Sequence, residues 1–290
     1  MPFRGGAAAL PKTKHKGKPM KTHMIETPNG RIAAHESAGQ GPAAVLIHGN
    51  SSSSRAFSKQ LDGPLGERFR LVAIDLPGHG ASDDARDPAL YSLRNHARSL
   101  RGAIDAFGLA DARLVGWSMG GHLALELAPD LPRARGFFIF GTPPLALPPA
   151  MELAFLPHPA MSAGSAETID RRQAAAYVAS FFAPGFSDVP AFFVEDALRA
   201  DGRARAGVNA SVRSGGYRDE AVVVRELAAP LAVLHGARDQ LVNGAYFATL
   251  TMPTLWRGAV QTIPGAGHAP QWETPQAFDA LLASFLEETG

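Results

Sequence analysis

The stretch Gly116-Trp117-Ser118-Met119-Gly120 constrains the fold more than any other part of the sequence. It lies between an apolar run that ends at Val115 and a helix-like run that starts at Gly121. This order predicts a serine on a tight strand-to-helix turn, where small flanking residues let the helix pass close to the strand. Because a chain with 30 glycines can contain such a string by chance, its meaning depends on the elements around it.

Short apolar runs alternate with helical patterns on both sides of this motif. Continuously apolar runs are typical of strands buried on both faces of a parallel sheet, and we predict such strands at residues 43–47, 70–75, 113–115, 136–141, 231–236 and 259–263. Apolar residues spaced by three and four predict amphipathic helices over 93–107 and 278–285, and a further helix follows Ser118. The Asn29-Gly30 turn predicts a β-hairpin over 22–36. The alternation indicates an α/β fold with a mostly parallel, doubly wound sheet.

The alternation stops between Leu145 and Ala229. This segment contains several prolines and helical stretches at 168–182 and 189–200, without a convincing strand. We therefore predict a helical cap over 145–229, inserted into a core domain formed by 22–144 and 230–290. Aromatic side chains of the cap could line a binding cavity or pack within the cap itself: Phe155, Tyr177, Phe181, Phe182, Phe192 and Phe193.

The composition excludes several classes of protein. No apolar run approaches the roughly 18 to 20 residues that a membrane span requires. The absence of cysteine excludes disulfides and thiolate chemistry, which agrees with a cytoplasmic location.

Positive charge is concentrated at the start of the chain. Residues 1–21 hold six of the 28 basic residues and no acid, which leaves 22 basic against 27 acidic residues elsewhere. We interpret 1–21 as a disordered basic extension without the apolar core of a secretory signal. The alternatives are a start codon placed too early, or a segment that binds nucleic acid or a membrane surface. The acidic remainder argues against nucleic acid as the main partner.

Three candidate catalytic residues follow three separate predicted strands: Ser118, Asp239 and His268. Their order along the chain, serine then acid then histidine, is that of the α/β-hydrolases. A serine hydroxyl needs a histidine to take its proton, and a carboxylate must hold that imidazole in the correct tautomer. The sequence therefore predicts nucleophilic acyl transfer.

Acyl transfer also requires donors for the oxyanion. The backbone N–H of Met119 is one candidate, and that of Asn50, in the loop that follows strand 43–47, is the other. We expect Asp75 and His79 to fix the turn after strand 70–75 by bonding to nearby backbone groups, rather than to form a catalytic pair.

Several strings together resemble those of the metal-independent N-acyl-homoserine lactonases within the α/β-hydrolase superfamily. They are His48-Gly49-Asn50-Ser51-Ser52-Ser53, Asp75-Leu76-Pro77-Gly78-His79-Gly80, Gly116-Trp117-Ser118-Met119-Gly120-Gly121-His122, Gly141-Thr142-Pro143-Pro144, Asp201-Gly202-Arg203-Ala204-Arg205 and Ala266-Gly267-His268-Ala269-Pro270. The resemblance covers roughly residues 22–288. It implies an α/β-hydrolase fold with a cap, substrate contacts at His48, Gly49, Trp117 and Tyr177, and an aspartate, Asp239, where close relatives carry a glutamate.

The resemblance implies hydrolysis of the lactone ester of an N-acyl-homoserine lactone, which is quorum quenching, with no cofactor or metal. None of the ten histidines has the His-x-His-x-Asp-His spacing of the metal-dependent lactonases. The expected partner is a small acylated lactone or ester, and the expected assembly is a monomer or homodimer. A general carboxylesterase, an amidase acting on the same signal and a lactone-binding protein with this fold remain alternatives.

Overall fold

A computed structural model describes residues 21–27 and 29–290 of the chain. The predicted basic extension lies outside these residues, except for Lys21, which begins the first strand. The described residues form one sheet in the order β1-β2-β4-β3-β5-β6-β7-β8. The strands are β1 Lys21–Thr27, β2 Gly30–Glu36, β3 Gly41–Ile47, β4 Phe69–Ile74, β5 Arg113–Trp117, β6 Gly136–Phe140, β7 Leu231–Gly236 and β8 Gln261–Ile263.

The pairing within the sheet confirms the predicted fold class. β2 pairs antiparallel with β1 and with β4, and all later pairs, from β4–β3 to β7–β8, are parallel. The hairpin turns at Gly30, whose φ of 112° favours glycine. β8 is shorter than predicted, because Arg257 and Gly258 both have positive φ and turn the chain just before it.

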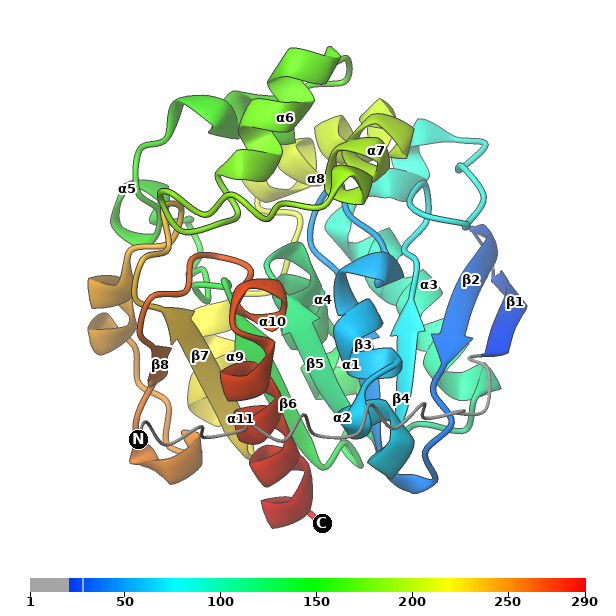
Figure 1. Ribbon diagram of the computed structural model, residues 1–290, viewed down its shortest axis with the longest axis vertical. Coiled ribbons are helices and arrows are strands. Elements are labelled where there is room, and N and C mark those ends of the chain that lie inside the picture. The colour runs from blue at the N-terminus through cyan, green and yellow to red at the C-terminus, as the bar shows by residue number, and fades with distance from the viewer. Residues whose placement is uncertain (1–20, 28) are drawn as a thin grey trace, which may run out of the picture.

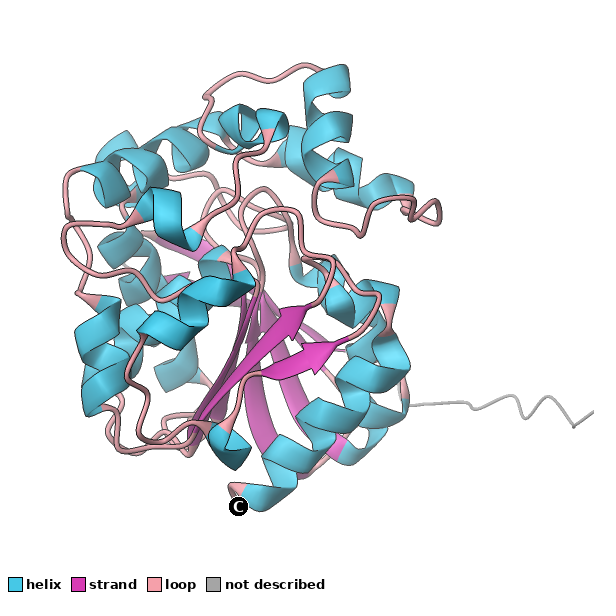
Figure 2. Cartoon of the chain, turned by 90° about the vertical axis from the view of Figure 1, so that its left-hand side faces the viewer, coloured by secondary structure: helices cyan, strands magenta, loops and turns pink. Residues whose placement is uncertain are grey.

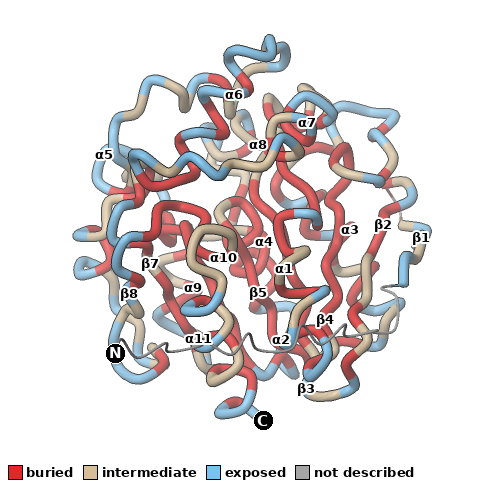
Figure 3. Tube along the Cα trace, viewed as in Figure 1, coloured by how far each residue is buried: buried red, intermediate tan, exposed pale blue. Residues whose placement is uncertain are grey.

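Helices cover both faces of the sheet (Figures 1 and 2). One face carries α3 Leu93–Ala106, α4 Met119–Leu127 and α9 Glu220–Glu226, and the other carries α1 Ser58–Leu61, α2 Pro64–Arg68 and α11 Pro275–Glu288. The central strands β3 to β7 are buried along most of their length, whereas the edge strand β1 is not (Figure 3).

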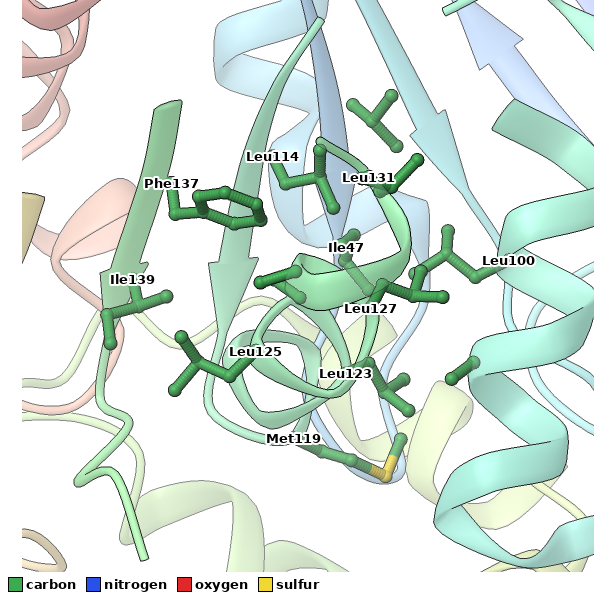
Figure 4. Packing of buried hydrophobic residues seen from close by; sticks show 14 of the residues in the cluster. Ile47, Leu100, Leu114, Met119, Leu123, Leu125, Leu127, Leu131, Phe137 and Ile139 are labelled. Atoms are coloured by element: carbon green, nitrogen blue, oxygen red, sulfur yellow. The ribbon is translucent and has the colours of Figure 1, made fainter. Parts of the chain in front are cut away.

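Each face of the sheet has its own apolar core. Val45 and Ile47 of β3 pack on the side of α3 and α4, whereas Ala44 and Leu46 pack on the opposite side. Figure 4 shows Leu123 and Leu127 of α4 in the first of these cores. Burial on both faces explains why the strands are continuously apolar in sequence.

A layer of helices lies over the carboxyl ends of the parallel strands (Figure 1). It contains α5 Met151–Ala154, α6 Arg171–Ala179, α7 Ala191–Arg199 and α8 Gly202–Arg213. The predicted helices at 168–182 and 189–200 correspond to the shorter α6 and α7, and α8 was not predicted because two glycines and an asparagine weaken its helical pattern. We propose 145–229 as the cap, with α9 returning the chain to the sheet.

None of the helices in the described part of the chain combines the length and apolarity that a bilayer span requires.

Candidate active site

Ser118 lies on the turn between β5 and α4 in a strained backbone conformation. Its φ of 53° and ψ of −120° are rare for a residue with a side chain. The turn is held on both sides, since the Ser118 N–H donates to the Phe140 carbonyl at 2.8 Å and Thr142 Oγ1 donates to the Ser118 carbonyl at 2.8 Å. A side chain at Gly121 would collide with Thr142 Oγ1, so the small residue allows this close approach.

The other two candidate catalytic residues meet through a short hydrogen bond. Nδ1 of His268, in the loop after β8, lies 2.8 Å from Oδ2 of Asp239, in the turn after β7. Oδ1 of Asp239 accepts the N–H groups of Leu241 and Val242 at 2.8 and 3.1 Å. Since an ionised carboxylate only accepts, Nδ1 carries the hydrogen and Nε2 is left as the proton acceptor.

The environment of Asp239 keeps it ionised. Burial alone would raise the pKa of this carboxyl, but the His268 ring and the two backbone N–H groups hold the pKa below its ordinary value. The backbone of His268 is also fixed, because Nε1 of Trp117 donates to its carbonyl at 2.8 Å. Trp117, expected at the substrate, therefore also positions the histidine.

Ser118 and His268 share a small chamber of about 40 Å³. No hydrogen bond joins the serine hydroxyl to the imidazole among residues 21–27 and 29–290, and such contacts often tighten only in the complex with substrate. Most of the other residues that line this chamber are apolar, and about half of them come from the cap. They are Gly49, Asn50, Trp117, Phe155, Met161, Tyr177, Phe181 and Leu241.

The two candidate oxyanion donors border a second chamber of about 150 Å³, which also reaches Ser118. Neither the N–H of Asn50 nor that of Met119 has a hydrogen-bond partner within the described part of the chain. The loop lies against the serine, since a Cβ at Gly49 would stand 3.2 Å from Cβ of Ser118. The side chain of Asn50 donates to the carbonyl of Gly164 in the cap at 2.7 Å.

The structure does not place His48 at the predicted substrate contact. The residue is fully buried, its Nδ1 donates to the Gly49 carbonyl at 2.7 Å, and its Nε2 accepts the Leu76 N–H at 3.0 Å. Burial lowers the pKa of this imidazole. Because both ring nitrogens are bonded to the backbone, His48 holds the loop that bears Asn50 instead of facing a ligand.

Asp75 and His79 fix their turn as expected, and they also hold the serine-rich loop. Asp75 accepts the Ala81 N–H at 2.8 Å within the turn and the Ser54 N–H at 2.7 Å from the loop. Nε2 of His79 accepts the N–H of Ser51, which has a φ of 57°. This second role was not visible in the sequence, because the contacts join segments more than 20 residues apart.

The cap contributes Tyr177 to both chambers. Burial raises the pKa of this phenol to about 12, so its hydroxyl stays protonated at neutral pH. Arg205, from the Asp201–Arg205 string, is also buried and donates to carbonyls of the cap, among them Ala166 at 2.8 Å and Ala197 at 3.1 Å. Arg205 therefore serves the internal structure of the cap, whereas Asp201 of the same string bonds to the core, to the Tyr91 hydroxyl at 2.7 Å and the Gly78 carbonyl at 2.8 Å.

The six cap aromatic residues singled out from the sequence divide into two groups. Phe155, Tyr177 and Phe181 line the small chamber. The others pack against one another and against core tryptophans: Phe182, Phe192 and Phe193. Some of these aromatic residues thus line a cavity, and the others serve in packing.

Two carboxylates that the sequence analysis missed join the cap to the catalytic loops. Glu273 accepts the Gly267 N–H beside His268 and the Ala183 N–H of the cap, both at 2.8 Å. Asp196 of α7 accepts the Ser53 hydroxyl at 2.6 Å. No local pattern marks these links, because the contacts of Glu273 with Ala183 and of Asp196 with Ser53 join residues 90 and 143 positions apart.

The site thus combines a strained serine, a histidine–aspartate pair and two backbone N–H groups that no described residue bonds, which is the arrangement of a serine hydrolase. Within the described ranges, no group of three or more histidine, aspartate or glutamate residues could hold a metal ion. The model of the alpha/beta hydrolase family matches residues 44–281, and the chain belongs to this family.

Known relatives point to ester chemistry. The chain is 30% identical to the pimeloyl-[acyl-carrier protein] methyl ester esterase of Xylella fastidiosa (strain 9a5c), over 87% of this chain and 97% of that protein. The structure of the present chain is similar to that of the N-acyl homoserine lactonase AidH complexed with N-butanoyl homoserine. The TM-score is 0.89, and the identity is 37% over 93% of this chain and 97% of that chain. An aryl esterase candidate from Burkholderia cenocepacia has a TM-score of 0.77 and 25% identity, over 93% and 99%.

Proposed function

We propose that this protein opens the lactone ring of N-acyl-homoserine lactones, with Ser118, His268 and Asp239 as its catalytic triad. The observation that carries the proposal is the likeness to the lactonase AidH, which extends over 93% of the chain and includes the cap. The two small chambers that meet at Ser118, Asn50 and Tyr177 are in keeping with a compact substrate.

The geometry supports a two-step acyl transfer. Ser118 Oγ attacks the lactone carbonyl carbon while Nε2 of His268 takes the hydroxyl proton, and the N–H groups of Asn50 and Met119 bond to the oxyanion. The bond to the ring oxygen then breaks, and the imidazolium returns its proton to that oxygen, leaving an open-chain acyl-enzyme.

Water completes the reaction. His268 removes a proton from a water molecule, the hydroxide attacks the acyl carbon, and Ser118 leaves with the proton from His268. The product is the N-acyl-homoserine. Throughout, Asp239 holds the imidazole in the tautomer that exposes Nε2 and stabilises its positive form.

A general carboxylesterase is the second candidate, favoured by the 30% identity to a methyl ester esterase over nearly the whole of that protein. The triad serves both reactions equally, so only the substrate distinguishes them. Release of a fatty acid instead of ring opening would indicate the amidase alternative.

The decisive experiment follows proton release from homoserine lactones of graded acyl length, alongside p-nitrophenyl esters, with product masses determined by mass spectrometry. We expect ring opening by the wild type and none by Ser118→Ala, while Ser284→Ala on α11, remote from the site, serves as the matched control. Brisk cleavage of p-nitrophenyl esters with every lactone left intact would reject the lactonase proposal in favour of the esterase.

A further inference from the structure

The second chamber has a polar side that the proposed mechanism does not use. Beside Ser118 and Met119 it is lined by apolar residues such as Met151, Val208 and Val212. Its polar lining includes His122 of α4 and Glu220, the first residue of α9. This polar pair lies in a chamber with several apolar lining residues, so it is a candidate for recognising a polar group of a ligand.

The geometry of this pair defines which atom faces the chamber. Nδ1 of His122 lies 2.9 and 2.8 Å from the two carboxylate oxygens of Glu220, which is only 1% exposed. One of these oxygens also accepts the Leu145 N–H at 2.7 Å. A carboxylate has no hydrogen to give, so the hydrogen lies on Nδ1 and the lone pair lies on Nε2.

This lone pair is available to a ligand. Nε2 of His122 has no hydrogen-bond partner among the residues that the structure describes, and the side chain keeps 15% of its surface exposed although Glu220 is buried. An acceptor in this position selects a ligand that carries an N–H or O–H donor.

The position of His122 relative to Ser118 specifies the donor. His122 lies in the first turn of α4, four residues after Ser118, and both residues line the same chamber. In an N-acyl-homoserine lactone, the amide nitrogen is attached to the ring carbon next to the carbonyl. A carbonyl held at Ser118 therefore brings the amide N–H into the chamber that His122 also lines.

We propose that Nε2 of His122, oriented by Glu220, accepts the amide N–H of the substrate and so selects N-acylated lactones over lactones without this donor. The proposal rests on the proposed lactonase function and adds the group by which the substrate is recognised. His122 would be a specificity-determining residue, and Glu220 a positioning residue that acts through the histidine tautomer.

The test compares N-hexanoyl-homoserine lactone with its analogue in which a CH2 group replaces the amide N–H. Loss of one hydrogen bond should lower kcat/KM of the wild type for the analogue by roughly 3- to 10-fold. His122→Phe should lose a similar factor on the amide substrate and treat both compounds within about twofold of each other. His23→Phe, which removes an imidazole paired with Glu36 on the hairpin, is the matched control and should keep the wild-type preference.

Glu220→Gln tests the tautomer without a change of volume. Its amide oxygen can accept the Leu145 N–H, and its NH2 group then replaces one of the two oxygens near Nδ1 of His122, so a single oxygen that is shared with Leu145 is left to hold the imidazole hydrogen on Nδ1. The tautomer with a lone pair on Nε2 is therefore held less firmly, and the preference for the amide substrate should fall, with the fold checked by circular dichroism. This variant decides the question if His122→Phe does not fold.

The outcomes separate the two proposals. If the wild type opens both lactones and the folded variants keep its preference, the recognition role of His122 is wrong and the lactonase proposal stands. If the wild type opens no lactone, the proposed function fails and the role of His122 fails with it.

Discussion

Replacement of Asp239 by asparagine should abolish catalysis while leaving the fold intact. Oδ1 of Asp239 accepts two backbone N–H groups, from Leu241 and Val242, so the oxygen of an asparagine must take that position. Its NH2 group then faces Nδ1 of His268, where Oδ2 now lies at 2.8 Å. The imidazole must place its hydrogen on Nε2, and it can no longer accept the proton of Ser118.

The expected size of the effect follows from this change of tautomer. The equivalent substitution in a serine protease triad lowers kcat by about 10⁴-fold, or about 5.4 kcal/mol at 1.36 kcal/mol for each factor of ten. Steady-state kinetics on a reactive p-nitrophenyl ester and on the lactones should show this loss in kcat. Asp188→Asn, at an exposed position of the cap, is the matched control.

The result that would refute the reasoning is specific. If Asp239→Asn kept more than about one-hundredth of wild-type kcat with an unchanged circular dichroism spectrum, Asp239 would not be the residue that orients His268.

Three further predictions concern the elbow, the buried histidines and the cap. Gly121→Ala should destabilise the protein by about 1–3 kcal/mol in denaturant unfolding, because the new methyl group collides with Thr142; unchanged stability would contradict the packing. His96 is fully buried, and burial lowers its pKa to about 4. Between pH 6.5 and 4 the unfolded chain therefore binds more protons than the folded chain, so the free energy of unfolding decreases as the pH is lowered through this window. His96→Phe should reduce the slope of the unfolding free energy against pH by up to about 1.4 kcal/mol per pH unit. Parallel plots of unfolding free energy against pH for the wild type and the variant would disprove this. Glu273→Gln keeps one oxygen for the two N–H groups of Gly267 and Ala183, so the loop that carries His268 should be held less firmly. We expect kcat to fall several-fold while the protein stays folded, and a kcat equal to that of the wild type would exclude this role of Glu273.

The order of elements could be predicted, and the candidate triad proposed, because their signals are local. A continuously apolar run predicts a strand buried on both faces, as in β3 and β5, and small residues around Ser118 predict the tight turn between β5 and α4. Parallel strands bring their carboxyl ends to one edge of the sheet, so Asp239 and His268 were expected to approach each other from strand order alone.

The contacts between the cap and the core could not be predicted. His48 belongs to the same motif as Asn50, yet the fold directs its ring into the backbone and away from the chamber. Glu220 bonds to His122 and Glu273 to Ala183 across 98 and 90 residues of the chain, although the second partner of Glu273, Gly267, is only six residues away.

The sequence by itself therefore determined the fold class and the chemistry of the candidate triad, because both depend on residue types at fixed places along strands and turns. Only the tertiary structure decided which polar groups face the chambers beside Ser118. A side chain such as His122 becomes a candidate for substrate recognition only when a buried carboxylate from α9 holds one ring nitrogen and leaves the other in the cavity. That choice is made by packing between distant segments, for which the linear pattern carries no signal.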